Sequence, residues 1–382
     1  EIRELLQNLH EKNREGLDEL FIEVLSYEPD DSPIPLDRKT EFSEYLDGEP
    51  VSIASKSSFR IIHIPVADSN LYVSKQRQIV KKLHKNYSDS LFVFSTRDWE
   101  QVQFVNVRST KGEHETEDDR RGALFMRRMT VIKGEPVRTA AERLTLIDIA
   151  TLKDQSLFVT GVQVRNAHDE AFDVAKVTEE FYGKYLLVLD AFRESFVKQG
   201  ASKQTAHRFT LQTLNRLMFV YFVQKKGWLA GRKAFVNDIW REYRNRQEGA
   251  NTFYSEWLKP LFFTAFKGKA AFIRLSENVP SGVVELFRKV PYLNGGLYGE
   301  TEADTDMHIE VPNLVLQDEL FSKAIGFFES YNFTISEDSP LDQEVAVDPE
   351  MIGRVYESLV NISEPGSEAT EDRQKQRAAG IF

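Results

Sequence analysis

The chain has 382 residues, of which 41% are hydrophobic and 29% charged, and its net charge is −11. This length exceeds one ordinary hydrophobic core, so we expect two or three domains. The absence of cysteine excludes disulfides and thiolate zinc sites and indicates a reducing compartment. No charged-then-apolar leader follows Glu1, and we expect a cytoplasmic fragment with no membrane partner.

Residues 1–150 carry the patterns of a small α/β domain. Apolar residues at helical spacing predict a helix within residues 2–27, which the run from Pro29 to Pro35 ends. A second helix is expected at Lys75–Lys85. Short β-branched and aromatic segments predict strands, mostly antiparallel to their neighbours, at Phe59–Val66, Leu91–Ser95, Gln101–Val107 and Leu124–Val131.

Residues 151–345 are expected to form a large, mostly α-helical domain, which makes the fold class α+β. The predicted helices lie at Thr139–Leu152, just before and across the boundary, and at Thr178–Gln199, Thr205–Lys226, Val236–Arg246, Thr252–Phe266 and Val283–Phe287. A further helix, Pro349–Val360, follows an Asp348 cap and begins a third, incomplete domain at residues 346–382.

The helix Thr205–Lys226 is expected to be the centre of the helical domain. Its second half is apolar almost all round and should be buried. Gly227 can take the left-handed cap, and Trp228 and Leu229 can fold back onto the last turn.

Positive charge is concentrated around this helix. From Lys198 to Arg246 eleven Lys and Arg residues face only two acidic ones, a local balance of +9, and Arg120–Arg143 is a second basic run. Such asymmetry is typical of a nucleic-acid surface on an acidic protein, although a solvated basic helix would look the same. The candidate phosphate contacts, among the aromatic residues Trp228, Phe235, Trp240 and Tyr243, are Arg232, Lys233, Arg241 and Arg244.

Motifs for catalysis or metal binding are weak. The seven histidines lack metal-site spacing, and the glycine-rich run 294–299 fits a tight turn better than a phosphate loop. A metal-dependent nuclease commonly needs an acidic-x-Lys triplet on a strand. The one such triplet, Asp37–Lys39, lies in a proline-flanked loop, and Gln101–Arg108 offers only Asn106 and Arg108. We therefore expect no working nuclease of that kind, with an unrecognised nuclease site as the remaining alternative.

Three segments together resemble a known family. They are Asn215–Leu229, Val290–Tyr298 and Asp348–Leu359, and their order and spacing match as well. They are similar to the region before the catalytic domain in large adenine-specific (N6) DNA methyltransferases of the type IIG restriction-modification and phage-exclusion kind. The resemblance covers roughly residues 139–382.

The resemblance also implies a cofactor and a function. Arg377–Phe382 is similar to the start of the segment that helps hold S-adenosylmethionine, which would place Gly380 and Phe382 at the cofactor. The glycine-rich loop and the Asn-Pro-Pro-Tyr tetrad are absent, so we expect no catalytic residue in the fragment. Its expected roles are to bind double-stranded DNA and to give structural support to the missing methyltransferase and target-recognition regions. The alternative is a stand-alone DNA-binding or assembly subunit of a defence system.

Overall fold

The computed structural model describes residues 1–36, 44–109, 124–155, 158–247, 249–293, 296–333 and 342–347. The chain divides into two compact units. Unit 1 holds Glu1–Val177 with the described residues 330–332 and 342–346, and unit 2 holds Thr178–Glu329 with Phe333 and Val347. A sheet-containing unit followed by a helical one confirms the α+β class. The first division between the units follows Val177.

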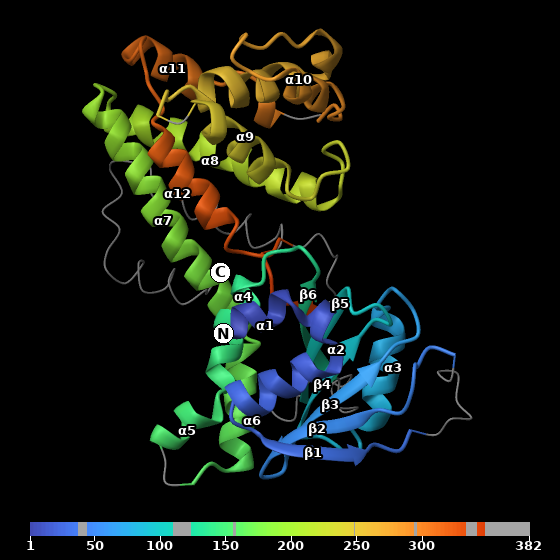
Figure 1. Ribbon diagram of the computed structural model, residues 1–382. Helices are drawn as coiled ribbons and strands as arrows, with labels where there is room; N and C mark the ends of the chain where they lie inside the picture. The colour runs from blue at the N-terminus through green and yellow to red at the C-terminus, as the bar shows by residue number, and fades with distance from the viewer. Residues whose placement is uncertain are drawn as a thin grey trace, which may run out of the picture. The chain divides into compact units, whose positions relative to one another are not determined.

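Unit 1 is built on a mixed sheet whose strands lie in chain order (Figure 1). The strands are β1 (Glu28–Pro33), β2 (Val51–Lys56), β3 (Phe59–Pro65), β4 (Ser90–Ser95), β5 (Gln101–Ser109), β6 (Leu124–Ile132) and β7 (Asp342–Glu344). Neighbours pair antiparallel except β3 with β4 and β6 with β7. All four predicted strands are present as β3, β4, β5 and β6.

The strands β1, β2 and β7 were not predicted. β1 carries prolines and acidic residues and is mostly exposed, so it has none of the apolar alternation that predicts a strand. It pairs with β2 through the backbone, so the segment expected to end the first helix also forms an edge strand. β7 has three residues and reaches β6 from more than 200 positions away in the chain.

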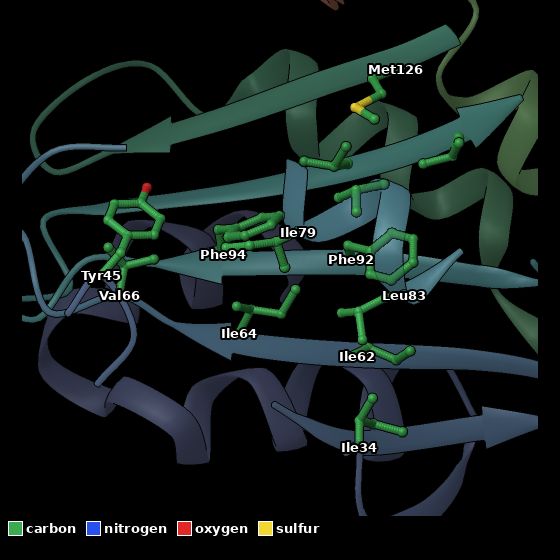
Figure 2. Packing of buried hydrophobic residues seen from close by; sticks show 13 residues of the cluster. Ile34, Tyr45, Ile62, Ile64, Val66, Ile79, Leu83, Phe92, Phe94 and Met126 are labelled. Atoms are coloured by element: carbon green, nitrogen blue, oxygen red, sulfur yellow. The ribbon is translucent and has the colours of Figure 1, made fainter. Parts of the chain in front are cut away.

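One face of the sheet packs against helix α3 (Val73–Leu83), and Figure 2 shows Ile79 and Leu83 of this helix in the same buried cluster as Phe92 and Phe94. Ile62 and Ile64 of β3 lie beside Phe92 and Phe94 of the parallel strand β4. Parallel strands need a crossover connection, and α3 is that connection. The buried set on this face also includes Ile79, Val80, Leu83, Val105, Val107 and Met126.

The opposite face is covered by the N-terminal helices and by α6 (Gly161–Ala171). Phe21 packs edge-on against Phe104 of β5 with ring centroids 6.2 Å apart, and His168 of α6 stacks on Phe59 of β3 at 4.2 Å. The expected first helix is broken into α1 (Ile2–Gln7), α2 (Leu9–Asp18) and a π-helix (Glu19–Val24), with Asn13 at a positive φ of 55°. The segment after β6 forms α4 (Arg138–Leu144), a 3₁₀ turn (Thr145–Ile147) and α5 (Ile149–Gln155).

Unit 2 is helical. Its helices are α7 (Val174–Lys198, starting in unit 1), α8 (Lys203–Lys225), α9 (Phe235–Gln247), α10 (Ser281–Arg288), α11 (Glu302–Glu310) and α12 (Asp318–Phe328). Two π-helices (Phe253–Leu258 and Leu261–Lys269) and 3₁₀ turns (Ala270–Phe272 and Gly296–Tyr298) complete it. Helices α6, α11 and α12 were not predicted. Within the described ranges, every helix is too short or too polar to cross a bilayer.

Candidate nucleic-acid interface

Helix α8 is the buried centre of unit 2, as its apolar pattern predicts. Sixteen of its 23 residues are buried. The Ser202 side chain caps its start by accepting a hydrogen bond from the backbone of Thr205 at 3.1 Å. Phe219 is the exception in the apolar second half, with 44% of its surface exposed. The helix therefore forms the core of unit 2 and positions the turn that follows its C-terminal end.

Arg216 of α8 is fully buried and was not among the residues singled out in the sequence. Its guanidinium donates to both carboxylate oxygens of Asp304, at 2.7 and 2.6 Å, and to the carbonyls of Leu297 and Gly299, both at 2.8 Å. The Tyr298 hydroxyl donates back to the Arg216 carbonyl at 3.0 Å. Two of the three segments that carry the family resemblance are thus joined by one side chain.

Asp304 belongs to α11, which the same contacts fix against α8. Burial raises the pKa of the Asp304 carboxyl, but hydrogen bonds and charge from Arg216 outweigh it and leave that pKa below its usual 3.8. Asp304 also closes a capping box with Thr301. The prediction that the glycine-rich run is a tight turn is confirmed for its described residues 296–299, where the Gly299 amide donates to the Gly296 carbonyl at 3.1 Å.

The turn between α8 and α9 is tightly held. Gly227 and Gly231 have φ of 72° and 74°, and Ala230 is also left-handed at 53°. The buried Gln224 side chain accepts a hydrogen bond from the backbone of Val236, at the start of α9, at 3.0 Å. The predicted glycine cap at Gly227 is confirmed.

The two residues after the cap behave differently. Leu229 is fully buried, as predicted, but Trp228 is 59% exposed. Of the two residues expected to fold back onto the last turn of α8, only Leu229 is buried. The other aromatic residues of the basic stretch are buried in the core of unit 2, so a ligand in solvent cannot stack on them. They are Phe235, Trp240 and Tyr243.

Helix α9 buries one face and exposes a basic one. Arg232 and Arg241 are brought together because both bind Asp238, at 2.8 and 3.3 Å. Their side chains remain 52% and 64% exposed. Lys233 and Arg244 are exposed residues of the same segment. This surface, formed by Arg232, Lys233, Arg241 and Arg244, is called the α9 basic surface below. It can bind an anion, since the guanidiniums of Arg232 and Arg241 remain more than half exposed.

Strands β2 to β6 contain no Asp or Glu. Asn106 and Arg108 of β5 instead meet a carboxylate from a helix, Asp169 of α6, at 2.9 and 3.2 Å. This carboxylate is occupied by an amide and a guanidinium. Among the described residues no group of three or more His, Asp or Glu side chains could hold a metal ion.

Several positions singled out in the sequence lie outside the described residues. They are Asp37–Lys39, Pro349–Val360, Gly380 and Phe382.

Comparison with known proteins gives one relative. Over 163 residues the chain is 28% identical to a protein of Methanocaldococcus jannaschii named, provisionally, a type II restriction enzyme and methyltransferase. The match covers 43% of this chain and 13% of that protein, so the chain corresponds to a small part of the relative. No family model matches, and no solved structure matches. Over the matched part, the chain is related to a restriction-modification protein.

Proposed function

We propose that this chain is the N-terminal part of a site-specific adenine-N6 DNA methyltransferase of the type IIG restriction-modification or phage-exclusion kind. The relative from Methanocaldococcus jannaschii supports a restriction-modification role. The three resembling segments support the adenine-specific class. In the whole protein the methyl donor would be S-adenosylmethionine, with Gly380 and Phe382 at the cofactor, and residues 151–345 would pack against the methyltransferase domain.

The role proposed for residues 1–382 is contact with the phosphates of double-stranded DNA through the α9 basic surface. The observation that carries it is the pairing of Arg232 and Arg241 on Asp238, which holds two half-exposed guanidiniums beside one another. Asp238 neutralises one of these two charges, and although Glu329 also lies near Arg241, burial raises the pKa of its carboxyl and so disfavours its charged form. A DNA phosphate can bind the donors that remain in solvent.

The test is duplex binding measured by fluorescence anisotropy at several salt concentrations. We expect Arg232→Gln/Arg241→Gln to weaken binding and to reduce the slope of log K against log salt by about 1.8, because each lost phosphate contact removes about 0.9. Arg288→Gln/Lys289→Gln, at the exposed C-terminal end of α10, removes the same two charges and is the control for a general charge effect. An unchanged slope in the first variant would end the proposal for this surface.

The methyltransferase assignment has its own test in the coding sequence. A reading frame that continues after Phe382 with Tyr-Thr-Pro, a glycine-rich loop and an Asn-Pro-Pro-Tyr tetrad would support it. A stop codon at that point would contradict it and favour the stand-alone DNA-binding or assembly subunit.

A further inference from the structure

Trp228 is a large apolar side chain held in solvent by a well-fixed turn. It is 59% exposed, whereas Trp240 and Trp257 are 7% and 0% exposed. Exposing an indole gives up the stabilisation that its burial would provide. The turn nevertheless offers a way to bury an apolar residue, because the next residue, Leu229, is fully buried.

The backbone of this turn is fixed at both ends. The Gly227 amide donates to the Gln224 carbonyl at 2.8 Å, and the Gly231 amide donates to the Gly227 carbonyl at 3.0 Å. Ala230 lies at a φ of 53°, a conformation that costs a non-glycine residue energy and persists only where the surroundings impose it. Trp228 therefore projects from an ordered turn, so little backbone entropy is lost when it binds a partner.

The charge around Trp228 indicates the chemistry of that partner. Four basic residues flank it in sequence, namely Lys225, Lys226, Arg232 and Lys233. Residues 225–237 contain no acidic residue. An exposed aromatic ring among basic residues matches a nucleotide, since the ring can stack on the base while the cations bind the phosphates on either side. A hydrophobic protein surface would not need four positive charges.

We propose that Trp228 stacks on an unpaired or unstacked DNA base beside the α9 basic surface. This inference rests on the proposed function, because it requires the DNA backbone to lie along that surface. An indole can reach the flat face of a base only where the base has left the stack, at a strand end, a gap or a locally opened step. The intact part of the duplex is held through its phosphates alone.

The test compares two fluorescein-labelled probes, a blunt duplex and the same duplex with a short thymine gap. We expect Trp228→Ala to weaken binding of the gapped probe about 5- to 150-fold, the range that stacking of one base gives. The salt slope should stay unchanged because no charge is lost, and Trp228→Phe should retain most of the affinity. Tyr292→Ala, which removes an aromatic residue of similar exposure (57%) elsewhere in unit 2, is the matched control.

Fluorescence of the protein gives a second readout. In a Trp99→Phe background the remaining tryptophans are Trp228, Trp240 and Trp257, and only the first is exposed. Saturating gapped DNA should quench the tryptophan emission of the Trp99→Phe variant and should reduce the further quenching of that emission by iodide.

The outcomes separate the two proposals. If the wild-type protein binds neither probe, the proposed function fails. If it binds both and Arg232→Gln/Arg241→Gln weakens binding, while Trp228→Ala binds the gapped probe with wild-type affinity and gapped DNA leaves the emission of the Trp99→Phe background unquenched, the stacking proposal alone is refuted. The exposed indole would then be assigned to a protein surface.

Discussion

The buried ion pair between Arg216 and Asp304 is expected to be a main determinant of the stability of unit 2. Asp304→Asn keeps the size of the side chain and an oxygen that can still accept from Thr301, but it removes the negative charge. Arg216, which is fully buried, is then left without a counter-charge. Removing one partner of a buried pair costs about 3–5 kcal/mol, so we expect a loss of that size in the free energy of unfolding.

A matched control lies on the same helix. Asp306 of α11 also pairs with an arginine of α8, Arg208, at 3.1 Å, but their side chains are 42% and 38% exposed. Exposed pairs contribute about 1 kcal/mol or less, so Asp306→Asn should change stability little. Both variants remove one negative charge from α11, and they differ in the burial of the pair.

The assay is urea unfolding followed by tryptophan fluorescence in the Trp99→Phe background. The remaining tryptophans all belong to unit 2, so the signal reports that unit. If Asp304→Asn lowers the free energy of unfolding by no more than Asp306→Asn does, the buried pair does not stabilise unit 2 as expected. Arg216→Lys should also be costly, because an ammonium cannot donate the two parallel hydrogen bonds that the guanidinium makes to Asp304.

The difference in the free energy of unfolding between wild type and Asp304→Asn should depend on pH, because the pKa of Asp304 is lowered in the folded state. Because the folded-state pKa lies below 3.8, the contribution of the carboxylate is present above that pH and is lost as the pH falls through the folded-state value. The gap between wild type and Asp304→Asn should therefore narrow only in acid below about pH 4. A gap that already narrows between pH 7 and pH 5 would contradict the assignment.

Two further changes test other parts of the fold. Gly227→Ala should cost about 1 kcal/mol in urea unfolding, because Gly227 has a φ of 72° although nothing lies within 4 Å of an added Cβ. Gly183→Ala, inside α7 and equally unobstructed, should instead stabilise by about 1 kcal/mol, and the same sign for both would refute the backbone argument. Burial lowers the pKa of His168 from 6.5 to about 3, so the unfolded state takes up a proton that the folded state excludes and stability falls as the pH drops below about 6.5. His168 should account for about 2 kcal/mol of the loss between pH 7 and pH 5, so the loss should be smaller by that amount in His168→Gln. Burial also lowers the pKa of His63 to about 3, and the contribution of that histidine should remain in the variant.

Local sequence patterns predicted much of the fold. Strands β3 to β6 and helices α3, α7, α8 and α9 were expected within a few residues of their observed ends. The reason is that each buries one face or most of its surface, and burial imposes a period of 2 or 3.6 on the sequence. β1 and α11 were missed because their surfaces are largely polar and carry no such period.

The candidate site was predicted only in part. The sequence located the basic stretch and the glycine cap after α8. It also grouped four aromatic residues with the charges, although Phe235, Trp240 and Tyr243 are core residues and Trp228 alone is exposed. An arginine within the apolar half of α8 was the one available sign that Arg216 has a buried partner.

The sequence by itself determined the α+β class, the order of the main elements and the concentration of positive charge around α8 and α9, because these depend on composition and on short-range periodicity. Only the tertiary structure decided that Arg216 binds Asp304, 88 residues away, that Arg232 and Arg241 share Asp238, and that Trp228 faces solvent while Leu229 does not. These features depend on which distant segments meet and on how much room remains between them, and no local pattern records either.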